Sequence, residues 1–384
     1  MKAIYLDNGA TSYPKPACVA ESINNYIVNV GATINRSVYA KAATAGMVTM
    51  SLRERACRLF NFNDPKHVII TAGNTASLNL IIKGYLKKGD HVIVSALEHN
   101  SVMRPLVQLQ NEGLITFDRF PSAKDGLIEM DKVESCFKPN TKLVIVCHAS
   151  NVSGTVQDIN AIGAICEKKG VPFVVDAAQS AGHINVDFKA AKLSAMTVPG
   201  HKGLLGPQGI GLALLAPDFA KQLNPFIVGG TGSASDSEEQ PEYMPDRFES
   251  GTSNMPGIYG LEASLGFIEE TGIDALRKHE IELTKRFIEG LKKVKGIRIV
   301  GPEDLDKHVG VVSIDCLEQD NAEVAYVLET KYGILTRCGL HCAPNAHKTL
   351  GTFPQGVIRF SLSWFNKEED IDAAVKAVSE ILAI

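Results

Sequence analysis

Residues 195–203 read Ala-Met-Thr-Val-Pro-Gly-His-Lys-Gly, an apolar run that ends in a histidine and a lysine. Upstream, residues 173–179 read Phe-Val-Val-Asp-Ala-Ala-Gln, a second apolar run that ends in an acid. Short apolar runs of this kind are typical of strands buried on both faces of a parallel sheet. The carboxyl ends of parallel strands lie at one edge of the sheet, so we expect Asp176 and Lys202 to meet there.

Strand-like and helical patterns alternate from about residue 65 to 215, which predicts an α/β fold with a mostly parallel sheet covered by helices on both faces. The expected strands are Val68–Thr71, His91–Val94, Lys142–Val146, Phe173–Val175, Ala195–Val198 and Gly209–Leu215. The expected helices between them include Thr75–Lys87, Ser101–Gln110 and Ile159–Lys169.

A polar, glycine-rich stretch at residues 229–257 and a long helical region follow. Residues 297–384 predict a smaller α+β unit, with strands near Ile297–Val300, Val309–Asp315 and Gly356–Ser361 and a closing helix at Lys367–Leu382. We therefore expect a large domain at residues 16–256 and a small C-terminal domain at residues 257–384 that also takes in residues 1–15.

Composition narrows the class of protein. The 384 residues are 45% hydrophobic and 21% charged, as in ordinary globular proteins. The net charge of -4 and the scattered basic residues argue against a nucleic-acid partner. No apolar run approaches the roughly 20 residues that span a bilayer, and the N-terminus does not resemble a signal peptide. We expect a cytoplasmic protein with no membrane partner.

A carboxylate beside a lysine is the pair that pyridoxal 5′-phosphate requires. The lysine amine can form a Schiff base with its aldehyde, and the acid can hold its ring nitrogen protonated. The ordinary alternatives are a helix N-cap for Asp176 and an exposed loop position for Lys202. The apolar strand before Asp176 and the glycines on both sides of Lys202 favour the cofactor.

Other polar residues follow the expected strands and leave alternatives open. Residues 73–75, Gly-Asn-Thr, begin a helix and suit a phosphate, or form a plain helix cap. His99 can stack on a flat ring and act catalytically as an acid or base, or it can cap the next helix. Asn151 can bind a substrate carboxylate or the phenolic oxygen of the cofactor, or it can form a turn. Arg359 interrupts an apolar strand and requires a carboxylate partner, either from a substrate or from an internal acid.

The chain has eight cysteines, and six stand singly in apolar or helical surroundings typical of reduced core residues. Cys338 and Cys342 share the polar stretch 337–344, where a histidine and an arginine should favour a reactive thiolate at Cys342. Zinc is a further possibility, because Cys338, His341, Cys342 and His347 are close in sequence, but no Cys-x-x-Cys pair is present. We expect a nucleophile and no metal.

The order of these motifs resembles the class V, fold-type I pyridoxal phosphate enzymes, and more narrowly the group II (Suf type) cysteine desulfurases and selenocysteine lyases. The matching segments are residues 5–11, 98–99, 176–179, 200–202, 248–252 and the Cys342 loop. The resemblance covers nearly the whole chain and implies a seven-stranded, mostly parallel sheet with a smaller C-terminal domain.

The resemblance also implies roles for single residues. Lys202 would carry the Schiff base, Asp176 would hold the ring nitrogen and Gln179 the phenolic oxygen, while His99 would stack on the ring. The remaining implied roles are phosphate binding by Asn74, Thr75 and His201, contact with the neighbouring subunit's phosphate by Thr252, substrate-carboxylate binding by Asn151, Arg359 and Arg36, and sulfur acceptance by Cys342.

The chain departs from the family pattern at four places. The family usually has serine where Pro199 stands and histidine where Leu340 and Asn35 stand, and Cys338 replaces a residue without a thiol. These departures bear on substrate preference. Cys338, four residues from Cys342, could relay a persulfide or form a disulfide with it, although a tolerated small side chain is the simpler interpretation.

The implied function is a homodimeric cysteine desulfurase that converts L-cysteine to L-alanine and leaves a persulfide on Cys342. A sulfur-acceptor protein and a role in iron–sulfur cluster assembly belong to the same expectation. The alternatives are a selenocysteine lyase, a class V aminotransferase with no role for Cys342, and a non-catalytic cofactor-binding scaffold.

Overall fold

A computed structural model of the chain describes residues 3–34 and 39–383. Its main sheet has seven strands in the order β2-β8-β7-β6-β5-β3-β4. Strand β8 runs antiparallel to both of its neighbours and the other pairs are parallel. This confirms the expected α/β fold. The strands are β2 Val68–Thr71, β3 Asp90–Val94, β4 Ile115–Arg119, β5 Thr141–Cys147, β6 Phe173–Asp176, β7 Ala195–Pro199 and β8 Gly211–Leu215.

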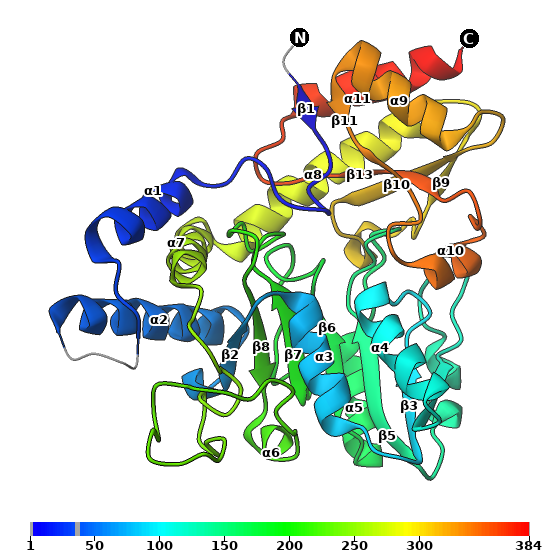
Figure 1. Cartoon of the computed structure of the whole chain (residues 1–384). Coiled ribbons are helices and arrows are strands. Elements are labelled where there is room, and N and C mark those ends of the chain that lie inside the picture. Colours follow the sequence, from blue (N-terminus) through cyan, green and yellow to red (C-terminus); the bar gives the residue numbers. More distant parts are fainter. Residues whose placement is uncertain (1–2, 35–38, 384) are drawn as a thin grey trace.

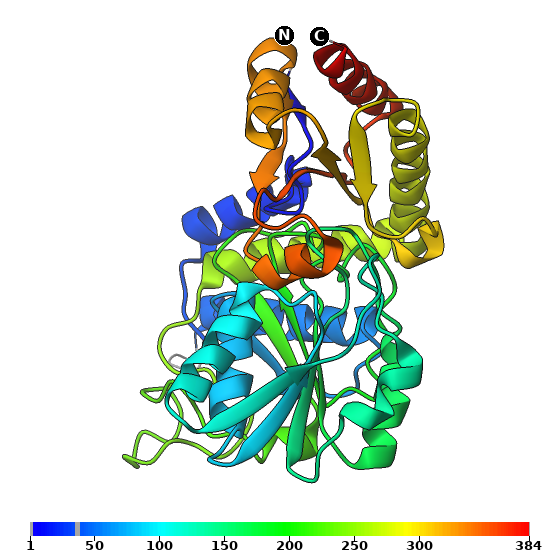
Figure 2. The ribbon, with the colours of Figure 1, turned by 90° about the vertical axis from the view of Figure 1, so that its right-hand side faces the viewer.

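Two apolar cores lie on the two faces of this sheet, as the buried central strands require (Figures 1 and 2). One face is covered by α2 (Ala40–Leu59), α5 (Ile159–Lys169) and α7 (Met255–Thr271). The other is covered by α3 (Asn74–Tyr85) and α4 (Asn100–Asn111), with the short α6 (Pro217–Ala220). All residues of β6, β7 and β8 are buried, so polar groups can only emerge at the strand ends.

A second sheet is antiparallel, in the order β12-β13-β10-β9. Its core lies against α8, α9 and α11. The chain's beginning joins this region, because β1 pairs in parallel with β11 and Asp7 bridges to Ser361. The elements are β1 Ile4–Tyr5, α8 Ile273–Leu291, β9 Ile297–Val300, β10 Val311–Cys316, α9 Asn321–Tyr332, β11 Ile334–Leu335, β12 Arg337–Gly339, β13 Val357–Ser361 and α11 Glu368–Leu382.

Short helical segments complete the fold. They are α1 Ala17–Asn25 with the π-helical η1 Tyr26–Val30, α10 Pro344–Leu350, and the 3₁₀ turns η2 Pro65–His67, η3 Met130–Lys132, η4 Glu134–Cys136 and η5 Leu305–Lys307. Within residues 3–34 and 39–383, no helix combines the length and apolar character needed to cross a membrane.

Candidate functional site

A cavity of about 530 Å³ opens where the carboxyl ends of β6 and β7 face the first turns of α3 and α4. It is large enough for a small organic cofactor. Eight of the residues that the sequence singles out line it: Asn74, Thr75, His99, Asn151, Asp176, Gln179, His201 and Lys202. The strand topology therefore brings Asp176 and Lys202 to one site, as the two apolar runs predicted.

Asp176 ends β6 with its side chain only 1% exposed. Its Oδ1 accepts hydrogen bonds from Asn74 Nδ2 at 2.9 Å and from the Ala178 backbone N–H at 3.0 Å. Burial raises the pKa of this carboxyl even though these donors oppose the rise. A positively charged group beside the carboxyl of Asp176 would lower its pKa again. Asn74 thus orients Asp176, a role that its place beside a phosphate motif did not suggest.

Lys202 lies on the loop after β7, which packs closely on the turn after β6. A Cβ on Gly203 would lie 2.3 Å from the Ala181 carbonyl oxygen, so only glycine fits this contact. Burial is the main cause that lowers the pKa of Lys202, to about 8. The amine is therefore far closer to neutral at physiological pH than an exposed lysine.

His201 precedes Lys202, and its carbonyl accepts hydrogen bonds from the Ser12 N–H at 2.9 Å and from Lys15 Nζ at 3.0 Å. Its ring is neutral, because burial and then Lys202 lower the pKa to about 4. Ring atom Nδ1 has no hydrogen-bond partner within the described residues and so can bind a ligand.

His99 caps α4 and also lines the cavity, so the capping role is observed and its position is compatible with stacking on a bound ring. Its Nδ1 accepts the Ser101 backbone N–H at 3.0 Å and lies 2.8 Å from Ser101 Oγ. Burial, followed by the charge of Lys202, lowers the pKa of His99 to about 4. The imidazole is consequently a neutral ring held in one orientation by its own helix.

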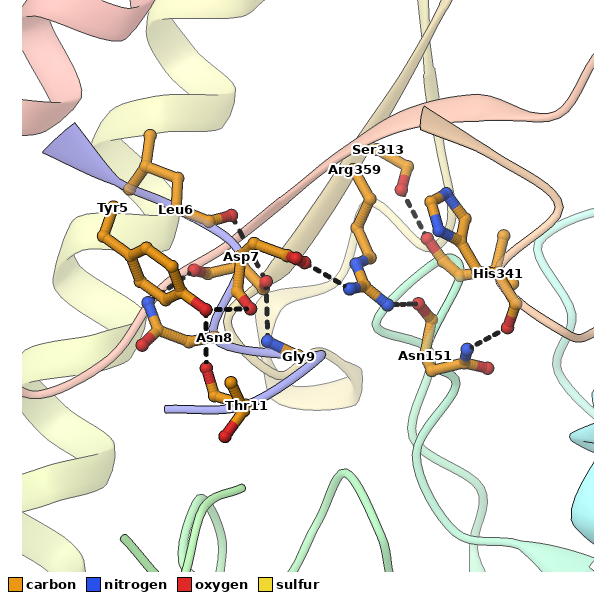
Figure 3. A network of polar contacts seen from close by, with 12 residues as sticks. Tyr5, Leu6, Asp7, Asn8, Gly9, Thr11, Asn151, Ser313, His341 and Arg359 are labelled. Atoms are coloured by element: carbon orange, nitrogen blue, oxygen red, sulfur yellow. Dashed lines mark hydrogen bonds and ion pairs between the residues drawn. The ribbon is translucent and has the colours of Figure 1, made fainter. Parts of the chain in front are cut away.

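Arg359 lies beside the cavity in an ion-pair network with Asp7 (Figure 3). Its Nη2 donates to Asp7 Oδ1 at 2.6 Å, and its Nη1 donates to the Asn151 carbonyl at 3.1 Å. Asn151 Nδ2 in turn donates to the His341 carbonyl at 2.7 Å. Of the two partners considered for Arg359, the structure contains the internal acid, and Arg359 is not among the residues that line the cavity.

The Cys342 loop is docked at the beginning of α4. The carbonyl of Cys342 accepts a hydrogen bond from the Asn100 N–H at 2.8 Å, one residue after His99. The Cys342 side chain is exposed, and its backbone has φ 57°. A thiol on an exposed loop beside the cavity can approach both a bound substrate and an external acceptor.

Cys338 lies instead on β12 and packs against the core of the four-stranded sheet. Burial raises the pKa of its thiol. Its thiol therefore faces apolar side chains, which argues against a relay or disulfide with Cys342. No group of three or more histidine, cysteine or acidic side chains in the described part of the chain is arranged to hold a metal ion.

The aminotransferase class-V family matches residues 4–374. The chain belongs to this family. A probable cysteine desulfurase of Pyrococcus abyssi is 34% identical over 99% of this chain and 94% of that protein. One from Methanothermobacter thermautotrophicus is 32% identical over 98% and 94%, respectively. The solved apo structure of a cysteine desulfurase from Thermococcus onnurineus superposes with a TM-score of 0.93, at 31% identity, and covers 99% of this chain and 95% of that one.

Class-V enzymes depend on pyridoxal phosphate, and the residues of this member fit that cofactor. The cavity offers a lysine amine of lowered pKa and a buried acid. It also offers the first turn of α3, whose backbone N–H groups favour a phosphate. His201 Nδ1 and Asn74 Oδ1, both on residues that line the cavity, are buried and have no partner within the described residues, as expected of groups that a ligand would satisfy.

Three further residues that the sequence of this class-V chain singled out are Thr252, Arg36 and Pro199. Thr252 is exposed and does not line it, which suits a residue expected to act on a neighbouring subunit. Arg36, with Asn35, lies outside the described residues. Pro199 lines the cavity where the family has serine, so that side chain offers no hydroxyl here.

Sequence reasoning missed one charged residue of the class-V site, Asp7, and considered a second, Arg337, only for its effect on the Cys342 thiol. Asp7 was part of a matched motif but had no assigned role, because its partner is 352 positions away. Arg337 is directly across from Arg359 in the β12–β13 ladder and is exposed. Its charge contributes to the lowered pKa values of His99 and Lys202. Strand pairing was the signal that could have found it.

Proposed function

We propose that this chain is a pyridoxal phosphate-dependent cysteine desulfurase that converts L-cysteine to L-alanine and retains the sulfur on Cys342. The observation that carries the proposal is the docking of the Cys342 loop onto α4 next to His99, at a cavity that holds both Lys202 and Asp176. An aminotransferase would require the lysine and the acid but not the exposed thiol.

Lys202, Asp176 and His99 would have separate roles in the reaction. Lys202 Nζ, with a pKa of about 8, can give up and take back a proton near neutral pH, which suits it to move the substrate's α-proton. The carboxylate of Asp176 holds positive charge at the buried end of the cavity, and the neutral His99 ring provides a flat face. Bound pyridoxal phosphate would supply the electron sink that makes the substrate's α-carbon acidic.

Sulfur transfer balances with no further reactant. The thiolate of Cys342 attacks the substrate sulfur, the Cβ–S bond breaks, and an S–S bond forms. The electron pair of the broken bond stays with Cβ, which takes a proton and becomes the methyl group of alanine. The product on the protein is a persulfide, and an exposed loop can present it to a thiol acceptor.

The test measures alanine release and persulfide formation from L-cysteine in the presence of a thiol reductant. We expect Cys342→Ala to lose at least about 100-fold in rate, because the sulfur loses its acceptor. Cys338→Ser is the matched control: it removes a thiol four residues away that faces the core, and it should retain normal turnover. A Cys342→Ala protein that forms persulfide at the normal rate would refute the assignment.

We also infer a homodimer. Apolar side chains that are more than half exposed occur on η1, α2 and the loop after α6. These segments lie toward the β2 edge of the main sheet (Figure 1). Ile27, Val28, Met47, Phe226, Ile227 and Val228 are 52–68% exposed. Exposed apolar patches of this kind mark interfaces in soluble proteins. A second copy on this face would suit the role expected of Thr252.

A further inference from the structure

We propose that Asp7 is a positioning residue for substrate recognition: its carboxylate holds the guanidinium of Arg359 in the orientation that binds the substrate's α-carboxylate. This inference rests on the proposed function, because it assumes an amino-acid substrate beside Asn151 and Arg359. Asp7 lies in the first strand-and-turn segment of the chain, far from every other site residue in sequence.

The guanidinium of Arg359 is restrained on several sides (Figure 3). Asp7 Oδ1 accepts from Nη2 at 2.6 Å, and the Asn151 carbonyl accepts from Nη1 at 3.1 Å. The backbone of Gly9 packs against the guanidinium, because a Cβ there would lie 3.2 Å from Arg359 Cζ. Two of the five N–H donors of an arginine are thus used, and Nε has no partner within the described residues.

The segment that carries Asp7 is itself fixed. The Gly9 N–H donates to Ser361 Oγ at 2.7 Å, and the Ser361 N–H donates to the Leu6 carbonyl at 2.7 Å. Ser361 is two residues from Arg359 on the same strand, so Asp7 and Arg359 belong to one hydrogen-bonded unit. On the far side, Gln179 Nε2 donates to the Gly9 carbonyl at 2.9 Å and ties this unit to the cavity wall.

This anchoring indicates that Asp7 stays paired with Arg359 when a substrate binds and is not displaced by it. The Ser361 ladder fixes the backbone that carries Asp7, so the Asp7 carboxylate could leave Arg359 only by rotation of its side chain. Arg359 is 1% exposed, and a buried guanidinium without its acid is strongly disfavoured. Arg337, opposite Arg359 on β12, would repel it further. Loss of the Asp7 charge should therefore leave the Arg359 guanidinium misoriented. We expect this effect on substrate binding to exceed the gain from removing the repulsion between the Asp7 carboxylate and the carboxylate of the substrate.

The experiment compares the holoenzyme with Asp7→Asn, which removes the charge at nearly constant shape, and with Asp7→Glu, which keeps it. Asp315→Asn is the matched control, because Asp315 pairs with Arg298 at 3.1 Å elsewhere in the same four-stranded sheet. Two measurements are made. One is kcat and KM for L-cysteine. The other is the affinity for L-alanine and for ethylamine, which lacks the carboxylate, from the absorbance of the bound cofactor.

We expect Asp7→Asn to raise KM for cysteine and weaken L-alanine binding by about tenfold or more, the usual scale for a charge-assisted contact. Its kcat should change much less, and ethylamine binding should not change. Asp7→Glu should fall between Asp7→Asn and wild type, and Asp315→Asn should match wild type. A purely structural role would weaken both ligands alike and would contradict the proposal.

Tighter or unchanged L-alanine binding by Asp7→Asn would overturn the proposal and identify Asp7 as a competitor or a bystander. If Asp7→Asn does not fold, Asp7→Glu provides the test, because it keeps the charge but displaces the carboxylate. If Asp7→Glu then prefers L-alanine over ethylamine as strongly as wild type does, the proposal is overturned. Failure of the proposed function gives a different result: wild type would release no alanine from cysteine, whatever the binding data for Asp7 variants.

Discussion

Burial, more than any single neighbour, sets the chemistry of Lys202. Removal of water from its amine lowers the pKa to about 8, Asp176 opposes this change, and Arg359 adds to it. The same loss of water keeps His99 and His201 neutral, with pKa values of about 4. At neutral pH the cavity is therefore lined by the partly deprotonated amine of Lys202 and by the uncharged imidazole rings of His99 and His201.

This titration gives a prediction for cofactor uptake. Only the unprotonated amine of Lys202 reacts with an aldehyde, so the initial rate of yellow absorbance on addition of pyridoxal phosphate to apoprotein should rise about tenfold per pH unit below pH 8. It should level off above that pH, because the amine is then free. An unshifted lysine would instead let the rate climb beyond pH 10, and that outcome would contradict the proposed environment. Lys202→Arg should show no imine absorbance beyond that of the free cofactor.

At this scale the sequence is informative where polar residues directly follow buried strands. Asp176, Lys202, His99 and Asn151 were all predictable, because parallel strands expose their carboxyl ends at one edge. Asp7 was not, because its ion pair depends on a bridge between β1's continuation and β13 that no local pattern encodes.

A close approach between β8 and the beginning of α3 shapes the end of the cavity that α3 lines. Strand β8 begins at Gly211, where a Cβ would lie 2.8 Å from Gly73 Cα and 2.8 Å from the Val198 carbonyl oxygen. Gly73 is the N-cap of α3. The glycine at 211 therefore lets the helix begin directly against the sheet, with its first N–H groups toward the cavity.

We predict that Gly211→Ala displaces the beginning of α3 and weakens cofactor binding, with a loss of about 1–3 kcal/mol in unfolding free energy from overpacking. Gly46→Ala is the matched control, because Gly46 lies in α2 with nothing within 4 Å of the added Cβ. That change should leave cofactor affinity intact and stabilise the helix by roughly 0.5–1 kcal/mol. Thermal unfolding with and without pyridoxal phosphate separates the two effects. Equal cofactor affinity in both variants would contradict this account of α3.

The expected strands coincide closely with β2, β3, β5, β6, β7 and β8, since each is a short apolar run. Strand β4 was not foreseen from the pattern. Only Ile115 of its five residues is buried, as befits an edge strand, and so its apolar signal is weak. The two-residue strands β1 and β11 were also missed, because pairs this short are defined by their partners rather than by their own sequence.

At the scale of the whole molecule, the inferred dimer predicts that charge on the apolar face separates the copies. We expect Val28→Lys combined with Ile227→Lys, at side chains 68% and 62% exposed, to give monomers in sedimentation velocity and to lower activity. Leu317→Lys, at an equally exposed apolar side chain outside this face, should remain dimeric. A double variant that sediments like wild type would exclude this face as the interface.

The division into domains at residues 256 and 257 stays a prediction. In its favour, the seven-stranded and four-stranded sheets have separate apolar cores. Leu6 packs in the core of the four-stranded sheet, which supports the assignment of residues 1–15 to the small domain, and this assignment also stays a prediction.

The pairing of β1 with β11, and of Asp7 with Arg359, also has a consequence for biosynthesis. A ribosome makes Asp7 352 positions before Arg359, so this ion pair cannot form until the residues between them have emerged. The main sheet can form in the meantime, because its strands end at residue 215. A nascent chain could thus form the cavity for the cofactor well before Asp7 can orient Arg359. Selectivity for the substrate's carboxylate would then develop later than binding of the cofactor.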